Sequence, residues 1–337
     1  MTRTVWPLLL AILLAAMSAC AADDSARISG PVLGYVVDPD AAGVRPIHGI
    51  PGAATLGPLL NLGSEIHRAA IAQQTGHLLA VVGEDRQVML YRNLAGEVSA
   101  APLADAPPAP DRILLSPSGS AAALLYNDRG LLAVLTGLPE APAVHRTLEL
   151  ASLPAGARVW AVSDDGARLL VSASAGETEA VSLVDAEGNL RLLLSAGPTT
   201  AAGFLAGSDE VVLADGLRNT VYWVRGEGEV IPLAGEKEGI SGPVAVSISR
   251  DNRRVFVANA GAGTVVVLDL AGGAPSVFAC DCTVTGLERM QGNAVFRLTD
   301  LSGDPMWLLD GDAPEARVVF VPPQRPVAQR AAQGDDK

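Results

Sequence analysis

The sequence predicts an all-β fold, a β-propeller built from four-stranded antiparallel blades, and three observations carry this prediction. A pattern of apolar strand, tight polar turn and second strand recurs, with its turns at positions 76, 119, 166, 207, 252 and 292. The intervals of 43, 47, 41, 45 and 40 residues match the length of one propeller blade. The chain holds 35 glycines and 23 prolines among 337 residues, which favours many turns over long helices. Its strand segments are rich in Val and Thr and alternate with period two, which argues against a solenoid of helix pairs.

The repeat is clearest in three copies, each with an apolar strand, a turn in which Gly or Asn can adopt positive φ, and further strands. The first two strands of these copies span 115–125, 162–172 and 248–258, and third strands are expected at Ala180–Val184, Val221–Val224 and Thr264–Leu268. A four-stranded sheet of this composition is apolar on both faces. Neighbouring sheets must therefore stack around an axis to bury those faces.

The number of blades depends on the residues before the first full repeat. Two further strands are expected at Pro31–Asp38 and Val44–Ile50, with Leu60–Leu62 as a possible third. They form either a shortened blade that closes a seven-membered ring, which we favour, or padding on the edge of a six-bladed one. The predicted organisation is a signal peptide over 1–20, a tether over 21–29, the propeller over 30–323 and a polar C-terminal tail over 324–337.

Two of the repeats resemble known propeller families. Residues 244–259, continued by Gly263–Val265 and Val267–Leu270, are close to a YVTN-type blade. The preceding repeat, with Asn219–Tyr222 and Pro232–Gly235, is similar to an NHL-type blade, and the resemblance extends loosely over residues 66–322. It implies strand packing rather than one reaction, because such families include lactone hydrolases, quinoprotein subunits, translocation components and proteins that only bind.

The first twenty residues predict export. Arg3 precedes an apolar run over Val5–Met17, which reaches only about 20 Å as a helix and is short of the roughly 30 Å hydrocarbon core of a membrane. A cleaved secretory signal is therefore favoured over a spanning anchor. Its end, Met17-Ser18-Ala19-Cys20, resembles the lipobox of bacterial lipoproteins, which implies lipidation of Cys20, and Ala21 after it implies passage to the outer membrane. The alternative is ordinary cleavage at these small residues, which leaves the protein soluble in the periplasm or outside the cell.

The charge balance disfavours one class of partner. Lys and Arg number 24 and Asp and Glu 37, which gives a net charge of −13 at pH 7 and a pI near 4.7. A surface of that sign repels phosphate backbones and anionic lipid head groups. We therefore expect no nucleic-acid partner, and membrane attachment only through Cys20.

The sequence carries no motif of a known catalytic centre. The four histidines, His48, His67, His77 and His145, show no metal-ligand spacing, and His77, just after a blade turn, is expected to be solvated. No nucleophile elbow, P-loop, dinucleotide fingerprint or haem-attachment motif occurs. We therefore nominate no catalytic, cofactor-binding or metal-binding residue and name no cofactor.

Acidic and amide residues at strand ends keep one enzymatic interpretation open. A metal-dependent lactonase needs such side chains to converge on the central channel from several blades. The candidates are Glu84, Asp128, Asp185, Asp215, Asn219, Asn259 and Asp300. Turns require Asp and Asn at the same places, so a structural role is the more common explanation for each.

Cys280 and Cys282 are the disulfide candidates. With Cys20 lipidated, an even pair in an oxidising compartment favours a bond between them. Residues two apart in an extended strand stand about 6.6–6.8 Å apart at Cα, at the limit for a disulfide, so the chain must bend there. A bridge at this point would pin the connection between the last two blades. The alternatives are weak metal binding, two buried thiols and a redox role.

Two further groups of side chains have structural expectations. Arg250, Arg253 and Arg254 are expected to decorate a solvated blade turn rather than an anion site. The tryptophans of the repeat region are expected to pack between blades, and they are Trp160, Trp223 and Trp307.

Together these features predict an exported, lipid-anchored and non-catalytic binding or scaffolding protein at the periplasmic face of the outer membrane, with an envelope protein as its partner. The alternative is a metal-assisted lactone hydrolase that uses channel-facing carboxylates. A third and weaker idea is a subunit of a quinone-linked oxidoreductase. The oligomeric state does not follow from the sequence.

Overall fold

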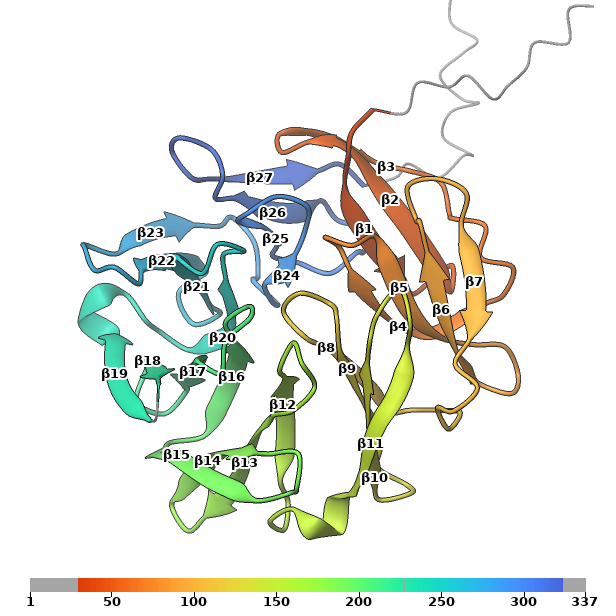
Figure 1. The fold of residues 1–337 in the computed structure, drawn as a ribbon. Helices are drawn as coiled ribbons and strands as arrows, with labels where there is room; N and C mark the ends of the chain where they lie inside the picture. The colour runs from red at the N-terminus through yellow and green to blue at the C-terminus, as the bar shows by residue number, and fades with distance from the viewer. Residues whose placement is uncertain (1–29, 227, 324–337) are drawn as a thin grey trace, which may run out of the picture. The chain divides into compact units, whose positions relative to one another are not determined.

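Seven antiparallel sheets stand around a central axis in the computed structural model of the protein, which describes residues 30–226 and 228–323 (Figure 1). Six of the sheets have four strands and the first has three. The seven-bladed propeller expected from the repeat is confirmed, and the six-bladed alternative is wrong. In the described part of the chain, no helix is long and apolar enough to cross a membrane.

The strands follow one another in chain order within every blade. Blades 1 to 3 contain β1 (Val32–Asp38), β2 (Gly43–Ile50), β3 (Ala53–Leu56); β4 (Ile66–Ala72), β5 (His77–Val82), β6 (Gln87–Arg92), β7 (Ser99–Pro102); and β8 (Arg112–Leu115), β9 (Ala122–Tyr126), β10 (Leu131–Thr136), β11 (Ala143–Glu149). Blades 4 and 5 contain β12 (Arg158–Val162), β13 (Leu169–Ala175), β14 (Thr178–Val184), β15 (Leu190–Ala196); and β16 (Thr199–Phe204), β17 (Val211–Asp215), β18 (Thr220–Arg225), β19 (Glu229–Ala234). Blades 6 and 7 contain β20 (Pro243–Ile248), β21 (Arg254–Asn259), β22 (Thr264–Asp269), β23 (Ser276–Ala279); and β24 (Glu288–Arg289), β25 (Val295–Arg297), β26 (Met306–Asp310), β27 (Arg317–Val321).

The six repeat turns connect the first and second strands of blades 2 to 7. Every turn position read from the repeat has a positive φ, from 57° at Asn252 to 106° at Gly292. Glycine and asparagine adopt this left-handed conformation at little cost, which is why the repeat places them there. We call the side of the ring that carries these turns the turn face.

Blade 1 runs in the opposite direction to its neighbours. The start of β1 lies beside the end of β4, because Gln73 bonds both main-chain groups of Tyr35, and the turn after β1 lies beside the start of β4, where the Ile66 N–H donates to the Ala42 carbonyl. A blade with an odd number of antiparallel strands begins on one face of the ring and ends on the other. Blade 1 must end on the face where β4 begins, which is the face opposite to the turn face. A three-stranded blade therefore starts at the turn face. The expected strands at 31–38 and 44–50 are confirmed, but the third strand is Ala53–Leu56 rather than Leu60–Leu62.

The hydrophobic core is divided into seven clusters, one between each pair of adjacent blades. Strand β5 shows how this division arises. Leu78 packs toward blade 1 and Leu79 toward blade 3, because successive side chains of a strand point to opposite faces. The three tryptophans pack against these clusters as expected, Trp160 between blades 4 and 5, Trp223 between blades 5 and 6, and Trp307 between blades 6 and 7. Each blade thus depends on both neighbours, and the ring has to close.

Side chains rather than a shared strand close the ring at the turn face. The amide of Gln73 accepts from the Tyr35 N–H at 2.8 Å and donates to the Tyr35 carbonyl at 2.7 Å, like a rung of a β-ladder. The amide of Gln74 reaches over blade 1 and donates to the carbonyls of Met290 and Gly292 in blade 7. These two glutamines, which we call the glutamine clasp, join blades 1, 2 and 7.

Candidate functional site

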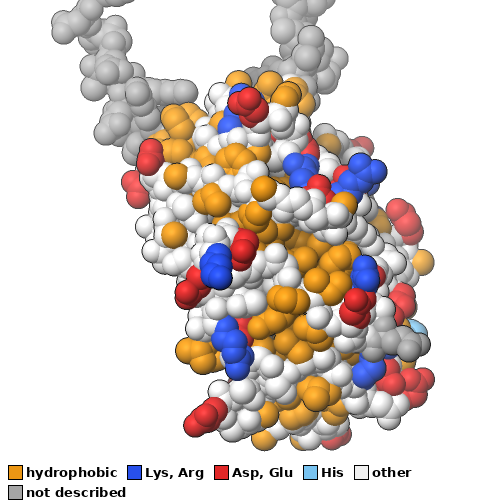
Figure 2. All heavy atoms as spheres, turned by 90° about the vertical axis from the view of Figure 1, so that its left-hand side faces the viewer, with side chains coloured by type: hydrophobic (Ala, Val, Ile, Leu, Met, Phe, Trp, Pro, Cys, Tyr) orange, Lys and Arg blue, Asp and Glu red, His pale blue; other side chains and the backbone are white. Residues whose placement is uncertain are grey.

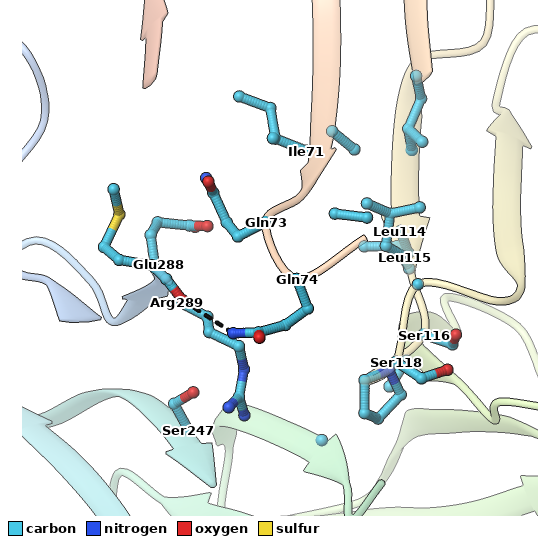
Figure 3. A pocket seen from close by; sticks show the side chains of 18 of the residues that line it. Ile71, Gln73, Gln74, Leu114, Leu115, Ser116, Ser118, Ser247, Glu288 and Arg289 are labelled. Atoms are coloured by element: carbon cyan, nitrogen blue, oxygen red, sulfur yellow. Dashed lines mark hydrogen bonds between the residues drawn. The ribbon is translucent and has the colours of Figure 1, made fainter. Parts of the chain in front are cut away.

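A cavity of about 480 Å³ lies on the propeller axis and is lined by the inner strands of all seven blades. Its wall reaches from the middle of these strands to the turn face at Gln74, Ser118 and Gly119 (Figure 3). The volume is within the range of about 300–1,000 Å³ that is usual for small-molecule sites. The cavity is therefore the candidate functional site.

Outside blade 7 the cavity wall is uncharged. Blades 1 to 6 contribute aliphatic, aromatic and small side chains, among them Ile71, Leu114, Trp160, Phe204 and Val246, with a few neutral polar groups. All the charged groups of the wall come from blade 7, and they are Glu288, Arg289 and Arg297. The cavity therefore has one charged side and an otherwise uncharged wall.

Arg289 is the unusual member of the charged side. Its Nη2 donates to the main-chain carbonyl of Ile248 in blade 6, whereas its Nη1 is buried with no hydrogen-bond partner. Among the described residues Arg289 has no ion-pair partner. Burial lowers the pKa of Arg289 to about 10, and the positive charge of Arg250 acts in the same direction. The side chain is thus charged at neutral pH in a place where no carboxylate compensates it.

The other two charged groups differ from Arg289. Arg297 pairs with Asp300 at 3.0 Å and donates to the Thr299 carbonyl. The exposed carboxylate of Glu288 makes no hydrogen bond or ion pair with any residue that the structure describes. Figure 3 shows the Glu288 and Arg289 side chains pointing apart along the wall.

Neutral polar groups stand at the turn-face end of the cavity. Gln74 is fixed on one side by blade 7 and on the other by Arg250, whose Nη1 donates to its Oε1 at 2.9 Å. Ser118 donates through both its N–H and its hydroxyl to Asp164 of blade 4. These bonds hold the mouth of the cavity in one shape.

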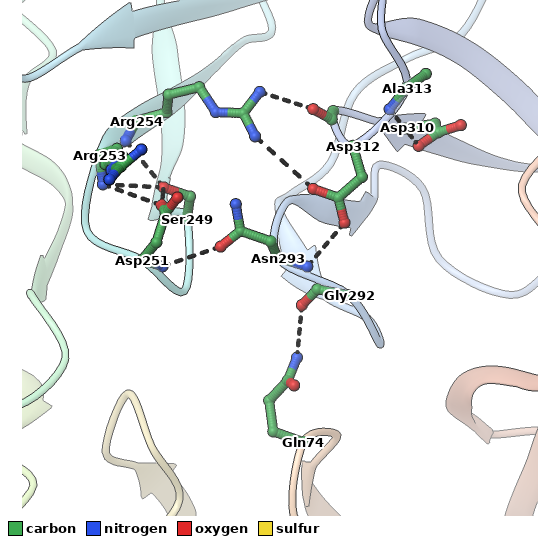
Figure 4. A network of polar contacts seen from close by, with 11 residues as sticks. Gln74, Ser249, Asp251, Arg253, Arg254, Gly292, Asn293, Asp310, Asp312 and Ala313 are labelled. Atoms are coloured by element: carbon green, nitrogen blue, oxygen red, sulfur yellow. Dashed lines mark hydrogen bonds and ion pairs between the residues drawn. The ribbon is translucent and has the colours of Figure 1, made fainter.

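A chain of polar contacts continues around the turn face (Figure 4). Asn293 accepts from the Asp251 N–H at 2.9 Å, and its own N–H donates to Asp312 at 2.7 Å. Arg254 donates to the Gly311 carbonyl and pairs with Asp312. The basic cluster at this turn is therefore not simply solvated decoration, since Arg250 and Arg254 join blade 6 to blades 2 and 7.

The strand-end residues considered for a lactonase do not meet in the cavity, since none of them forms part of its wall. Asp215 is fully buried and accepts the N–H groups of Gly197, Leu217 and Arg218, besides pairing with the Arg218 side chain. Asn219 and Asn259 are bonded within blades 5 and 6, Asp185 caps its own turn, Asp300 pairs with Arg297, and Glu84 and Asp128 are exposed. Over residues 30–226 and 228–323, no three His, Cys, Asp or Glu side chains are placed to hold a metal ion.

His77 is buried, and the expectation that it is solvated is wrong. It is the first residue of β5, with no exposed surface, and its Nδ1 lies 2.7 Å from the Thr75 hydroxyl while Nε2 has no partner. Burial lowers the pKa of His77 to about 4, helped by the charge of Arg92 and opposed by the main chain at Gly119. The next blade covers the imidazole, because Gly119 of blade 3 packs against it.

The cysteines occupy the places that the sequence suggests. The structure bridges Cys280 and Cys282, with their Cα atoms 5.0 Å apart, in the bent connection between β23 and β24. Cys280 packs in the cluster between blades 6 and 7. Cys20 lies outside the described residues.

The outer rim offers a second surface. Figure 2 shows hydrophobic side chains gathered on the side of the ring formed by the outer strands of blades 4 to 6, with basic and acidic side chains interspersed. Val230 of β19 and Val277 of β23 are exposed there, and Arg225 pairs with Glu229 at 2.7 Å. Basic and acidic side chains lie together on this side of the ring, so it is not a surface of a single charge sign.

Comparisons with known proteins support the fold only. No family model matches the chain, and no curated protein matches it by sequence. Among solved structures, a functionally unknown protein from Desulfotomaculum acetoxidans has a TM-score of 0.57 at 13% identity and covers 87% of this chain and 100% of its own. A protein from Lactobacillus plantarum has a TM-score of 0.53 at 15% identity, with 86% and 98% covered. Virginiamycin B lyase from Staphylococcus aureus has a TM-score of 0.51 at 12% identity, with 79% and 87% covered. At such identities no activity carries over, and the resemblance to YVTN and NHL repeats stays a prediction.

Sequence reasoning missed Arg289 and the glutamine clasp. One signal for Arg289 was present, because Glu288-Arg289 is a charged pair in an inner strand whose counterparts in the other blades give the cavity no charged group. Gln73 and Gln74 carried no signal, since their roles depend on other blades, with Tyr35 38 residues from Gln73 and Met290 216 residues from Gln74.

Proposed function

We propose that this protein is an exported, lipid-anchored binding protein of the bacterial cell envelope that uses the axial cavity and the turn face to hold its partner. The observation that carries the proposal is the cavity itself. It is lined by every blade, its wall combines apolar side chains with neutral polar groups, and on one side it has an arginine with no ion-pair partner among the described residues. Such a wall suits recognition, because apolar surface supplies affinity and a few fixed polar groups supply orientation.

The lactonase alternative has less support. Metal-assisted hydrolysis needs several carboxylates around one ion, and among residues 30–226 and 228–323 only Glu288 brings a carboxylate to the cavity wall. The strand-end acids that were its candidates are bonded into turns or exposed. A subunit of a quinone-linked oxidoreductase finds no specific support in the fold.

The envelope location rests on the sequence features around Cys20. A direct test expresses the full chain and a Cys20→Ala variant, and measures palmitate incorporation and partition between membrane and soluble fractions. We expect the wild type to be labelled and membrane-bound and the variant to be unlabelled and soluble. Equal partition of the two forms would contradict the anchor.

The binding function is tested by affinity capture from cross-linked envelope membranes with the same two chains. We expect a reproducible protein partner whose recovery depends on Cys20, because the anchor places the ring at the membrane surface. Absence of a partner with either form contradicts the proposal. Hydrolysis of simple lactones by the purified chain with added divalent metal, lost in Glu288→Gln, would establish the enzymatic alternative instead.

A further inference from the structure

We propose that the axial cavity binds a monocarboxylate with an apolar body, and that Arg289 holds the carboxylate. This inference deepens the proposed function by naming the chemistry that the cavity recognises. The carboxylate can belong to a small free acid or to the C-terminus of a partner's peptide chain, and the experiment below separates these sources.

The first argument is the uncompensated charge of Arg289. A buried guanidinium without a counter-charge is unfavourable, and buried charges in proteins are normally paired. Among the described residues Nη1 has no hydrogen-bond partner, and the charge that affects the pKa of the group is that of another arginine, Arg250. In a chain of net charge −13, the absence of a carboxylate partner at this point leaves the pairing to a ligand.

The second argument is that the guanidinium can turn to an incoming carboxylate at low cost. Its one hydrogen bond to a described residue is from Nη2 to the Ile248 carbonyl, a neutral acceptor. Rotation of the side-chain end toward the cavity exchanges that bond for a two-pronged pair with a carboxylate. Such charge-assisted bonds are about twice as strong as bonds to neutral groups, so the exchange is favourable.

The third argument is the shape and polarity of the rest of the wall. Away from blade 7, the wall includes the half-buried side chains of Ile71, Leu114 and Trp160. A ligand with its charge at Arg289 therefore lays its body along an uncharged wall that includes these apolar side chains. The volume of about 480 Å³ accommodates an aromatic acid or the last residues of a peptide.

The fourth argument concerns the number of charges on the ligand. Glu288 lies next to Arg289 in the same wall and is unpaired among the described residues. A second negative charge on a ligand that extends along this wall from Arg289 would approach this carboxylate, and like charges at short range disfavour binding. The site therefore selects a monoanion over a dianion.

The experiment is calorimetric titration of the full chain with matched probes. Phenylbutanoate and N-acetyl-leucyl-phenylalanine test the free acid and the peptide C-terminus, and their amides test the need for charge. Phenylsuccinate tests the second charge. We expect the carboxylates to bind at least about 10-fold more tightly than their amides, the usual effect of a bond to a charged group.

Variants assign the effect to Arg289. Arg289→Met should lower carboxylate affinity about 10- to 100-fold, and Arg289→Lys should restore part of it, because a charge remains without the fork geometry. Arg225→Met, on the rim, is the matched control and should bind like the wild type. Circular dichroism and thermal unfolding check that each variant folds.

The outcomes separate this inference from the proposed function. Equal affinity for acids and amides, or unchanged binding in Arg289→Met, overturns the carboxylate site while partner capture can still succeed. Tight binding of the peptide acid alone supports a partner's C-terminus, and tight binding of phenylbutanoate alone supports a free acid. Carboxylate binding at Arg289 without any captured partner keeps the site and overturns the protein-binding function.

Discussion

His77 makes the stability of the propeller depend on pH between 7 and 5. Its pKa falls from 6.5 in the unfolded chain to about 4 in the buried site, so the unfolded state takes up a proton in this interval and the folded state does not. Stability is therefore lost as the pH falls below 6.5, and the loss levels off below the folded pKa. The free energy of unfolding should drop by about 2 kcal/mol from pH 7 to pH 5, out of about 3 kcal/mol in total.

Carboxylates whose pKa is also shifted do not contribute to the change in stability between pH 7 and pH 5. Hydrogen bonds hold the pKa of Asp38, Asp165 and Asp251 below 3.8, against the opposing effect of burial. Their contribution is present above pH 3.8 and is lost only as the pH falls through their folded pKa values. Between pH 7 and pH 5 these groups stay ionised in both states.

The assay is urea unfolding of the full chain, followed by tryptophan fluorescence at the two pH values. His77→Gln should lose most of the pH dependence, whatever its absolute stability. His145→Gln makes the same chemical change at an exposed position and should retain the dependence of the wild type. If His77→Gln loses as much stability as the wild type between pH 7 and pH 5, the buried neutral imidazole is not the cause.

Three further predictions concern the clasp, a buried carboxylate and the cysteines. Gln73→Ala leaves the N–H and carbonyl of Tyr35 unpaired and should lower the free energy of unfolding by about 2–4 kcal/mol in urea titrations; an effect below about 1 kcal/mol would show that the clasp is dispensable. Burial opposes ionisation of Asp215, but N–H donors and Arg218 lower its pKa, so Asp215→Asn should be less stable at pH 7 and should lose less stability than the wild type when acidified below pH 4. The protein purified without reductant should be lighter by two hydrogens than its reduced form, and equal masses would show that Cys280 and Cys282 are free thiols.

The fold was predictable because the residue types that form each blade are determined within that blade. A turn that needs positive φ selects Gly or Asn, as at Gly76 and Asn252, and a strand buried on both faces selects a continuous apolar run, as at 121–125. These requirements recur with every blade, so their spacing could be counted. Blade 1 has neither the repeat turn nor a fourth strand, and for this reason its third strand was misplaced.

The site was less predictable because its residues act across blades. The wrong expectation for His77 shows the difficulty. Its position after a turn suggests exposure, but Gly119 of the next blade covers the ring, and no local pattern encodes that contact. Arg289 likewise becomes unusual only when the cavity brings the inner strands together and supplies no carboxylate.

The seam between blades 7, 1 and 2 combines closure of the ring with the charged side of the cavity. Gln74 bonds the carbonyl of Met290, the residue after Arg289, and accepts from Arg250, the charge that acts on Arg289. Blade 1 begins at the turn face, so the turn between its first two strands lies on the opposite face, and the clasp spans the gap between the inner turns of blades 2 and 7. The same contacts that close the ring thereby hold the main chain beside Arg289, where the cavity carries its uncompensated charge. The contacts that close the ring, on which the core between every pair of blades depends, therefore also preorganise a binding site at Arg289.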